Sequence, residues 1–266
     1  MNISTHLDEN NISIGYVFTF TDITRVTEME RYMKEKEKLA AIGELSANIA
    51  HEIRNPLAAL RTSIEMLKEK TEAEGRERKI MEIALREMDR LNRIITDFLI
   101  YSNPNPPEFK TILLSQVLKE ILSMLNQHVR SNGNIKIKYN LAEQVYIRAD
   151  ENKLKQVFWN LALNAVQAVD FNGEVEISLI QKGGFAKIFF KDNGKGIEPA
   201  NMVKIFYPFF TTKKDGAGLG LAMVYRIVNE HRGVVNVTSK PGEGASFLVV
   251  LPLDPENLSV LEGNNI

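Results

Sequence analysis

The 266-residue sequence contains no cysteine, which excludes disulfide bonds and thiolate metal sites and suits a reducing compartment. It has no apolar run near the roughly 20 residues that span a bilayer, and no signal peptide is visible at Met1. The net charge of -1 argues against nucleic acid or an anionic membrane as the main partner. We expect a cytoplasmic chain with room for two domains, anchored to a membrane only if a longer parent protein supplies the anchor.

The stretch from Leu39 to Leu67 contains the most informative histidine of the chain. His51 lies beside acidic Glu52 and one helical turn before Asn55. A lone histidine is more often structural than chemical. Here the apolar residues recur at steps of three and four and define a buried helical stripe that leaves His51 off it: Ile42, Leu45, Ile49, Ile53, Leu57, Leu60, Ile64 and Leu67. Pro56 should bend this helix beside an accessible imidazole, which makes His51 a candidate nucleophile.

Four further motifs follow in the second half of the chain. They are Asn160 and Asn164 in NLALNAVQA, Asp192 to Gly196 in DNGKG, residues 209–213 in FFTTK, and Gly216, Gly218 and Gly220 in GAGLG. Together with HEIRNP at 51–56, they resemble in order the H, N, G1, F and G2 boxes of bacterial two-component sensor histidine kinases. The resemblance covers about residues 35–253.

This resemblance and the hydrophobic pattern imply an α+β protein. We expect an antiparallel helical hairpin forming a dimeric four-helix bundle, followed by an α/β sandwich of the GHKL ATPase type. Residues 1–24 would be the remnant of a PAS-like sensor domain or a disordered leader, and both readings stay open. The remaining segments are a coiled-coil lead-in and phosphotransfer hairpin over 25–103, an ATP-binding domain over 104–254 and a disordered tail over 255–266.

The spacing of apolar residues along the chain predicts the individual helices and strands. We expect a helix over 25–70, a turn around Gly75, and a second helix over 77–101 that ends at the proline-rich SNPNPPE. The expected later helices are 114–131, 151–169 and 219–230. The expected strands are 12–24, 134–140, 145–149, 174–180, 185–191 and 246–251.

The resemblance implies roles for the polar residues of the second domain. Asn164 would be the direct Mg²⁺ ligand, because an amide oxygen suits this hard cation, and Asn160 would contact phosphate or a metal-bound water. Asp192 would accept a hydrogen bond from the adenine amine. Gly194 and Gly196 would allow the backbone to approach the base, which Ile197 would line.

The segment from Phe206 to Gly220 has the composition of a mobile lid. Phe209 and Phe210 are expected to anchor the lid to the core, and Lys213 is a candidate phosphate contact. The other nucleotide contacts implied by the resemblance are Thr212, Gly216, Gly218, Leu219 and Gly220, because the amides at the start of a helix can face a triphosphate.

One substitution separates the chain from related ATPases. Gyrase-type ATPases carry a water-activating glutamate where this sequence has Asn160, and an amide cannot act as a general base. The implied function is therefore an ATP-dependent kinase that phosphorylates His51, passes the group to an aspartate of a response regulator and also acts as its phosphatase. Glu52 would support the imidazole, Arg54 would neutralise phosphate and Asn55 would position water. The alternatives are an ATP-gated conformational machine and a non-catalytic dimerisation scaffold.

Overall fold

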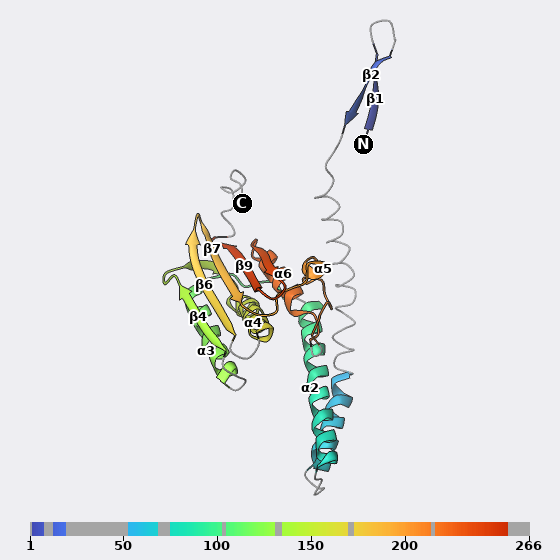
Figure 1. Cartoon of the computed structure of the whole chain (residues 1–266), viewed down its shortest axis with the longest axis vertical. Helices are drawn as coiled ribbons and strands as arrows, with labels where there is room; N and C mark the ends of the chain where they lie inside the picture. Colours follow the sequence, from blue (N-terminus) through green and yellow to red (C-terminus); the bar gives the residue numbers. More distant parts are fainter. Residues whose placement is uncertain are drawn as a thin grey trace.

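The structure is a computed structural model that describes residues 2–7, 13–19, 53–68, 75–102, 105–130, 135–169, 173–213 and 216–254. These residues form a β-hairpin, a helical hairpin and an α/β sandwich in chain order (Figure 1). No helix within the described ranges is long and apolar enough to cross a membrane.

The β-hairpin consists of β1 (Asn2–Leu7) and β2 (Ser13–Thr19), paired antiparallel. Strand β2 lies within the stretch whose alternating pattern predicts a strand, whereas β1 was not predicted because its sequence NISTHL has few β-branched or aromatic residues. Two strands alone are at best marginally stable. The assignment of 1–24 to a sensor remnant stays a prediction.

The helical hairpin pairs residues 53–68 with α2 (Arg76–Ser102). Its cross-helix contacts fall at steps of seven residues on both helices: Arg54 with Thr96 (3.5 Å), Arg61 with Asp89, and Lys68 with Glu82 (3.4 Å). The two residues of each pair are equally distant from Gly75 in the sequence. Gly75 lies in the turn and has a φ of +67°, which glycine adopts readily. The expected turn and second helix are confirmed. The expected helix over 25–70 is described only from residue 53 to residue 68, and it is helical there.

The α/β part is built on a five-stranded mixed sheet in the order β4-β6-β7-β9-β8, in which β4 and β6 are parallel and the other pairs antiparallel. Its strands are β4 (Lys136–Leu141), β6 (Glu174–Lys182), β7 (Phe185–Asp192), β8 (Val234–Lys240) and β9 (Gly244–Pro252). A separate two-stranded sheet pairs β3 (Lys110–Leu113) with β5 (Tyr146–Ala149).

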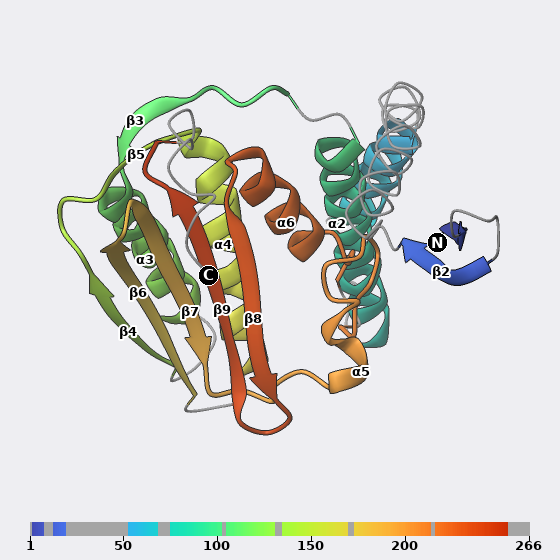
Figure 2. The ribbon, with the colours of Figure 1, turned by 90° about the horizontal axis from the view of Figure 1, so that it is seen from above.

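Helices α3 (Leu114–Arg130), α4 (Glu151–Ala168) and α6 (Gly220–Glu230) cover one face of the large sheet (Figure 2). Each buries one apolar stripe against the sheet or a neighbouring helix, and together with the inward residues of the strands they form one core. A fourth helix, α5 (Pro199–Met202), is a single turn just before the lid segment. The expected hairpin and α/β sandwich are therefore confirmed, while β3, β8 and α5 were not predicted.

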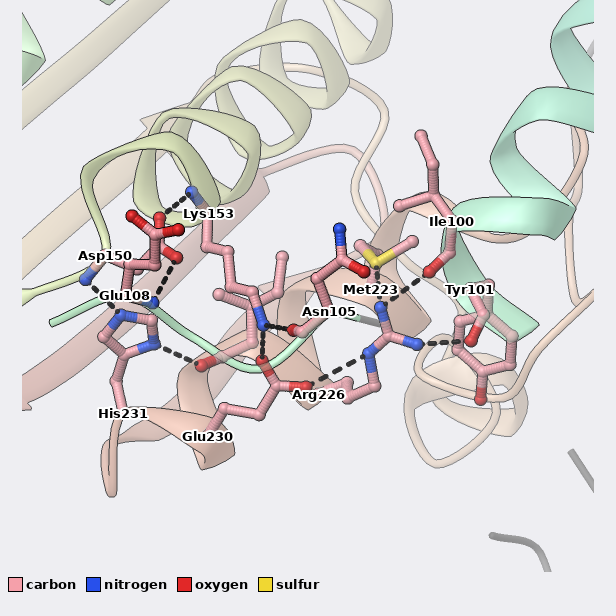
Figure 3. Close-up of polar contacts among 11 residues, drawn as sticks. Ile100, Tyr101, Asn105, Glu108, Asp150, Lys153, Met223, Arg226, Glu230 and His231 are labelled. Atoms are coloured by element: carbon pink, nitrogen blue, oxygen red, sulfur yellow. Dashed lines mark hydrogen bonds and ion pairs between the residues drawn. The ribbon is translucent and has the colours of Figure 1, made fainter. Parts of the chain in front are cut away.

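Asp150 joins three parts of the α/β domain. Its Oδ1 accepts the Lys153 amide at 3.1 Å and caps α4, and its Oδ2 accepts the Glu108 amide of the linker at 2.9 Å. Its own amide donates to Nε2 of buried His231 at 3.0 Å (Figure 3). Burial opposes the charged carboxylate, but the two amide hydrogen bonds and the Lys153 ammonium outweigh it. The pKa of Asp150 is therefore lowered from its ordinary value of 3.8.

We expect Asp150→Ala to lower the free energy of unfolding by about 2 kcal/mol, because it removes a helix cap and a linker hydrogen bond. Since the folded pKa is depressed, this stabilisation is present above pH 4 and is lost as pH falls through the lowered value. Urea unfolding at several pH values measures both effects. Exposed Asn152→Ala is the control, and a difference below about 0.5 kcal/mol between the two variants would remove Asp150 from this role.

Candidate active site

A cavity of about 450 Å³ opens between α4, the loop after β7, the start of α6 and one residue of α2. All of the expected binding residues of the second domain line it except Asn160 and Gly194. The cavity also contains residues that were not predicted, among them Asp97, Gln167 and Lys195. Gln167 follows Asn164 by three residues on α4, so helical spacing would have found it. Asp97 has no such signal, because it comes from the other domain.

Asp192 is the buried acid of the cavity, with 4% of its surface exposed. It ends β7, and its Oδ1 accepts amide hydrogen bonds from Gly194 (2.9 Å) and Ala245 (3.3 Å). No described residue donates a hydrogen bond to Oδ2, which is therefore available to an external donor. Burial raises the pKa of this carboxyl although both amide bonds oppose the rise.

The two glycines of DNGKG meet a packing requirement that the sequence did not indicate, while their expected role beside the base stays a prediction. A Cβ on Gly194 would lie 2.2 Å from the Ala168 carbonyl oxygen, and a Cβ on Gly196 would lie 2.0 Å from that of Lys240. Gly196 also has a φ of +69°. The close neighbours are thus the end of α4 and the end of β8, so these glycines let the loop pack against protein backbone.

The polar face of α4 holds a cation. The Lys213 ammonium lies 2.6 Å from Asn164 Oδ1 and 2.6 Å from Gln167 Oε1. Because both acceptors are neutral amides, burial together with nearby Lys195 lowers the pKa of Lys213 to about 8. The two oxygens therefore form a site that fits a positive charge, of the ligand type suited to Mg²⁺.

Asn160 faces the beginning of α6 instead of the cavity wall. Its Oδ1 would lie 3.4 Å from a Cβ placed on Gly220. No side chain caps α6 at Leu219, so its first amides remain available at the positive end of the helix dipole. Gly218, Leu219 and Gly220 line the cavity at this end. This arrangement suits an anionic group.

The lid contacts the core through Phe210, whereas Phe209 contacts the helical hairpin. Phe210 is partly buried against the core, as was expected of both residues. Phe209 is 57% exposed, and its ring centroid lies 6.1 Å from that of Phe98 on α2. It also has a φ of +64°, a strained value for an aromatic residue. Its expected contact with the core is therefore wrong.

The two residues central to the first motif, His51 and Glu52, lie outside the described residues. Asn55 is exposed on the helix that follows them, and Arg54 reaches Thr96 of α2. Residues 53–68 contribute no side chain to the cavity, and Asp97 alone represents the described hairpin there. The HEIRNP motif and the four later motifs thus lie in separate domains, and α2 of the first domain contacts the second.

Comparison with known proteins identifies both domains. Residues 149–255 match the family described as "Histidine kinase-, DNA gyrase B-, and HSP90-like ATPase", and residues 41–107 match the "His Kinase A (phospho-acceptor) domain". The chain belongs to the two-component sensor histidine kinases. Its second domain is the ATP-binding domain of this class.

Individual relatives agree with this assignment. The chain is 38% identical to the signal transduction histidine-protein kinase AtoS of Escherichia coli K12, over 91% of this chain and 40% of AtoS. It is 33% identical to sporulation kinase C of Bacillus subtilis 168, over 95% of this chain and 60% of that protein. The structure of histidine kinase ThkA in complex with response regulator TrrA matches with a TM-score of 0.65 and 28% identity, over 96% of this chain and 75% of that chain.

Full-length ShkA in complex with AMPPNP matches with a TM-score of 0.66 and 27% identity, over 79% of this chain and 46% of that one. The chain spans about half the length of the curated relatives that it matches.

We expect Asp192→Asn to weaken adenine-nucleotide binding by about 10- to 100-fold, because an amide nitrogen at the Oδ2 position would face the donor amine of the base. The Asn Oδ1 can still accept the Gly194 and Ala245 amides, so the loop should keep its conformation. Calorimetric titration with a non-hydrolysable ATP analogue measures the change. Glu176→Gln, on the exposed face of β6, is the charge-matched control. Equal affinity of the Asp192 and Glu176 variants would place adenine elsewhere.

Proposed function

We propose that the chain is an ATP-dependent protein-histidine kinase that phosphorylates its own His51 and transfers the phosphoryl group to an aspartate of a response regulator. The observation that carries this proposal is the cavity, which is lined by a buried acceptor, a cation-binding amide pair and a helix N-terminus. These groups complement the donor amine and the negative charge of an adenine nucleotide. Membership of the sensor histidine kinases supports the phosphotransfer step.

The residues of the cavity have separate roles in holding ATP. Asp192 accepts the adenine amine through Oδ2, and Ile197 packs beside the base. The triphosphate extends toward the start of α6, where the amides of Gly220 and its neighbours face it. Lys213 leaves the α4 amides and pairs with a phosphate oxygen, which gives the partly buried ammonium a charged partner.

Mg²⁺ fits the position that the Lys213 ammonium now fills between Asn164 and Gln167. When bound, it would neutralise charge on the phosphate oxygens. Asn164 is its direct protein ligand in this proposal, and Asn160 lies one turn away, toward α6.

The amide of Asn160 cannot deprotonate water, so the γ-phosphoryl group requires another nucleophile. A neutral His51 imidazole nitrogen attacks the γ-phosphorus, the bond to the bridging oxygen breaks and ADP leaves. Glu52 accepts the proton of the other ring nitrogen or orients it. Arg54, which contacts Thr96 in this structure, turns to the transferring phosphate.

The response regulator is the proposed protein partner, and ThkA, a relative of known structure, forms a complex with one. Its receiver aspartate takes the phosphoryl group from His51. Asn55 is exposed and follows His51 by four residues in the sequence, so in this proposal it holds a water molecule against the phosphoaspartate for dephosphorylation.

A homodimer is the proposed assembly, because the hairpin leaves large apolar side chains uncovered. Leu60 is 54% exposed and Ile80 57% exposed, although both lie on helices with a hydrophobic stripe. Other exposed members of this surface are Ile53, Leu67, Ile83 and Leu91. A second hairpin would cover them in a four-helix bundle.

We expect His51→Gln to bind nucleotide with unchanged affinity and to lose all phosphorylation, because the nucleophile and the cavity belong to different domains. Incubation with γ-labelled ATP and Mg²⁺ followed by gel analysis tests this. His128→Gln changes an exposed histidine of α3 and should keep full labelling. Substantial label on the His51 variant would overturn the assignment of the phosphorylated residue.

We expect Asn55→Ala and Glu52→Ala to separate the two activities. The Asn55 variant should dephosphorylate the regulator at least about tenfold more slowly and keep most of its kinase rate, because attack on ATP does not need the positioned water. The Glu52 variant should lose kinase activity first, since its carboxylate supports the imidazole. Initial rates of His51 labelling and decay of phosphorylated regulator measure both. Parallel losses in both variants would refute the division of roles.

A further inference from the structure

One lysine of the lid segment binds the polar face of α4. The Lys213 ammonium lies 2.6 Å from Asn164 Oδ1 and 2.6 Å from Gln167 Oε1. Its backbone is fixed by Thr211, whose Oγ1 accepts the Lys213 amide at 3.0 Å. A Cβ on Gly216 would lie 2.9 Å from the same Oγ1 and 3.5 Å from Lys213 Cβ, so this turn is closely packed. Contacts at both ends of the lysine side chain therefore set the position of the ammonium.

The acceptors of this ammonium are neutral. Among the described residues, Lys213 forms no ion pair, and Asn164 and Gln167 accept no other hydrogen bond through these oxygens. A partly buried cation normally requires an acidic partner, because burial removes water from the charge. Here two amide oxygens replace that water, as they would around a metal ion. A cation of the protein itself therefore fills the site that fits Mg²⁺.

An ammonium and a metal ion compete for these two oxygens. A metal ion bound to them at about 2.1 Å would lie within about 5 Å of a nitrogen that is 2.6 Å from each of them. At that separation two cations repel each other strongly where water is partly excluded. Two neutral amides alone are also a weak metal site, since Mg²⁺ is usually held by carboxylates together with substrate phosphates. The metal alone should therefore fail to displace Lys213.

A phosphate group can draw the lysine away. The first amides of α6 have no side-chain cap and lie at the positive end of the helix, and Gly218, Leu219 and Gly220 line the same cavity as Lys213. A phosphate held there offers the ammonium a charged acceptor, whose hydrogen bonds are stronger than those of neutral amides. Departure of the ammonium leaves both amide oxygens to a metal ion, which the phosphate also binds.

We propose that Lys213 is a built-in substitute for the metal ion, which keeps Asn164 and Gln167 closed to a divalent metal until a phosphate draws the ammonium away. Metal and phosphate then bind only together, and a nucleoside without phosphate leaves Lys213 in place. This inference rests on the proposed role of the cavity as an adenine-nucleotide site. It does not depend on the phosphorylation of a histidine.

The first experiment uses Mn²⁺ alone, whose electron paramagnetic resonance signal reports binding to the protein. Asn164→Asp gives the site a carboxylate ligand, and it is combined with either Lys213→Met or Lys204→Met. Lys204 is exposed and does not line the cavity, so the second combination is a control of the same net charge. We expect Mn²⁺ to bind at least about tenfold more tightly to the Lys213 combination, because no ammonium competes for the carboxylate. Equal affinities, or binding to neither combination, would overturn the competition.

The second experiment uses the unmodified chain, so it does not depend on how well a variant folds. Lysine labelled with ¹³C at Cε gives a nuclear magnetic resonance signal for Lys213, which is identified by its loss in Lys213→Met. We expect adenosine to leave this signal unchanged and ADP with Mg²⁺ to shift it. The signal of Lys119, exposed on α3, should stay constant with both ligands.

Binding of ADP and Mg²⁺ without a shift of the Lys213 signal would overturn the displacement, and so would an equal shift caused by adenosine. If ADP failed to bind while the Mn²⁺ affinities of the two combinations differed as expected, the proposed nucleotide site would fail. The competition between Lys213 and the metal would then stand.

Discussion

The rotational setting of α4 is the constraint on which the site depends. Leu154, Phe158 and Leu161 are fully buried on one side of this helix and fix its rotation against the sheet. The same rotation directs Asn164 and Gln167 toward the lid. Because successive residues on a helix are about 100° apart, a slip by one residue would bury the amides and expose the aromatic core. One rotation of α4 therefore determines both the packing of its apolar side chains and the position of its cavity-lining amides.

Asp192 and Lys213, which both line the cavity, have no partner of opposite charge bonded to them among the described residues. Asp192 is bonded to amides and Lys213 to neutral side-chain oxygens, and burial disfavours the charged form of both. Each gains more from a polar ligand than an already paired side chain would. A ligand that has a hydrogen-bond donor at one end and negative charge at the other can bind both Asp192 and Lys213. The site therefore matches such a ligand before any ligand binds.

The sequence predicted elements whose pattern is local and missed those that depend on context. Helix α3 was found because Leu114, Leu118 and Leu125 follow helical spacing. Strand β8 was missed although it pairs along β9, and β3 is too short to show a period. In the site, Asn164 and Asp192 were recognisable from their motifs. The contribution of Asp97 depends on how two domains meet, and the need for Gly194 depends on the distant Ala168 carbonyl, so neither has a local signal.

The spacing of contacts in the helical hairpin limits how its length can change. Three pairs recur every seven residues on both sides of Gly75, so each pair fixes the same alignment as the others. Deleting or inserting one residue near the turn would shift one helix by one residue relative to the other. All three pairs would then be misaligned at once. Lengthening both helices by one heptad would keep every alignment. Hairpins built on this pattern can therefore vary in reach only in whole heptads, with the turn carried unchanged at the tip.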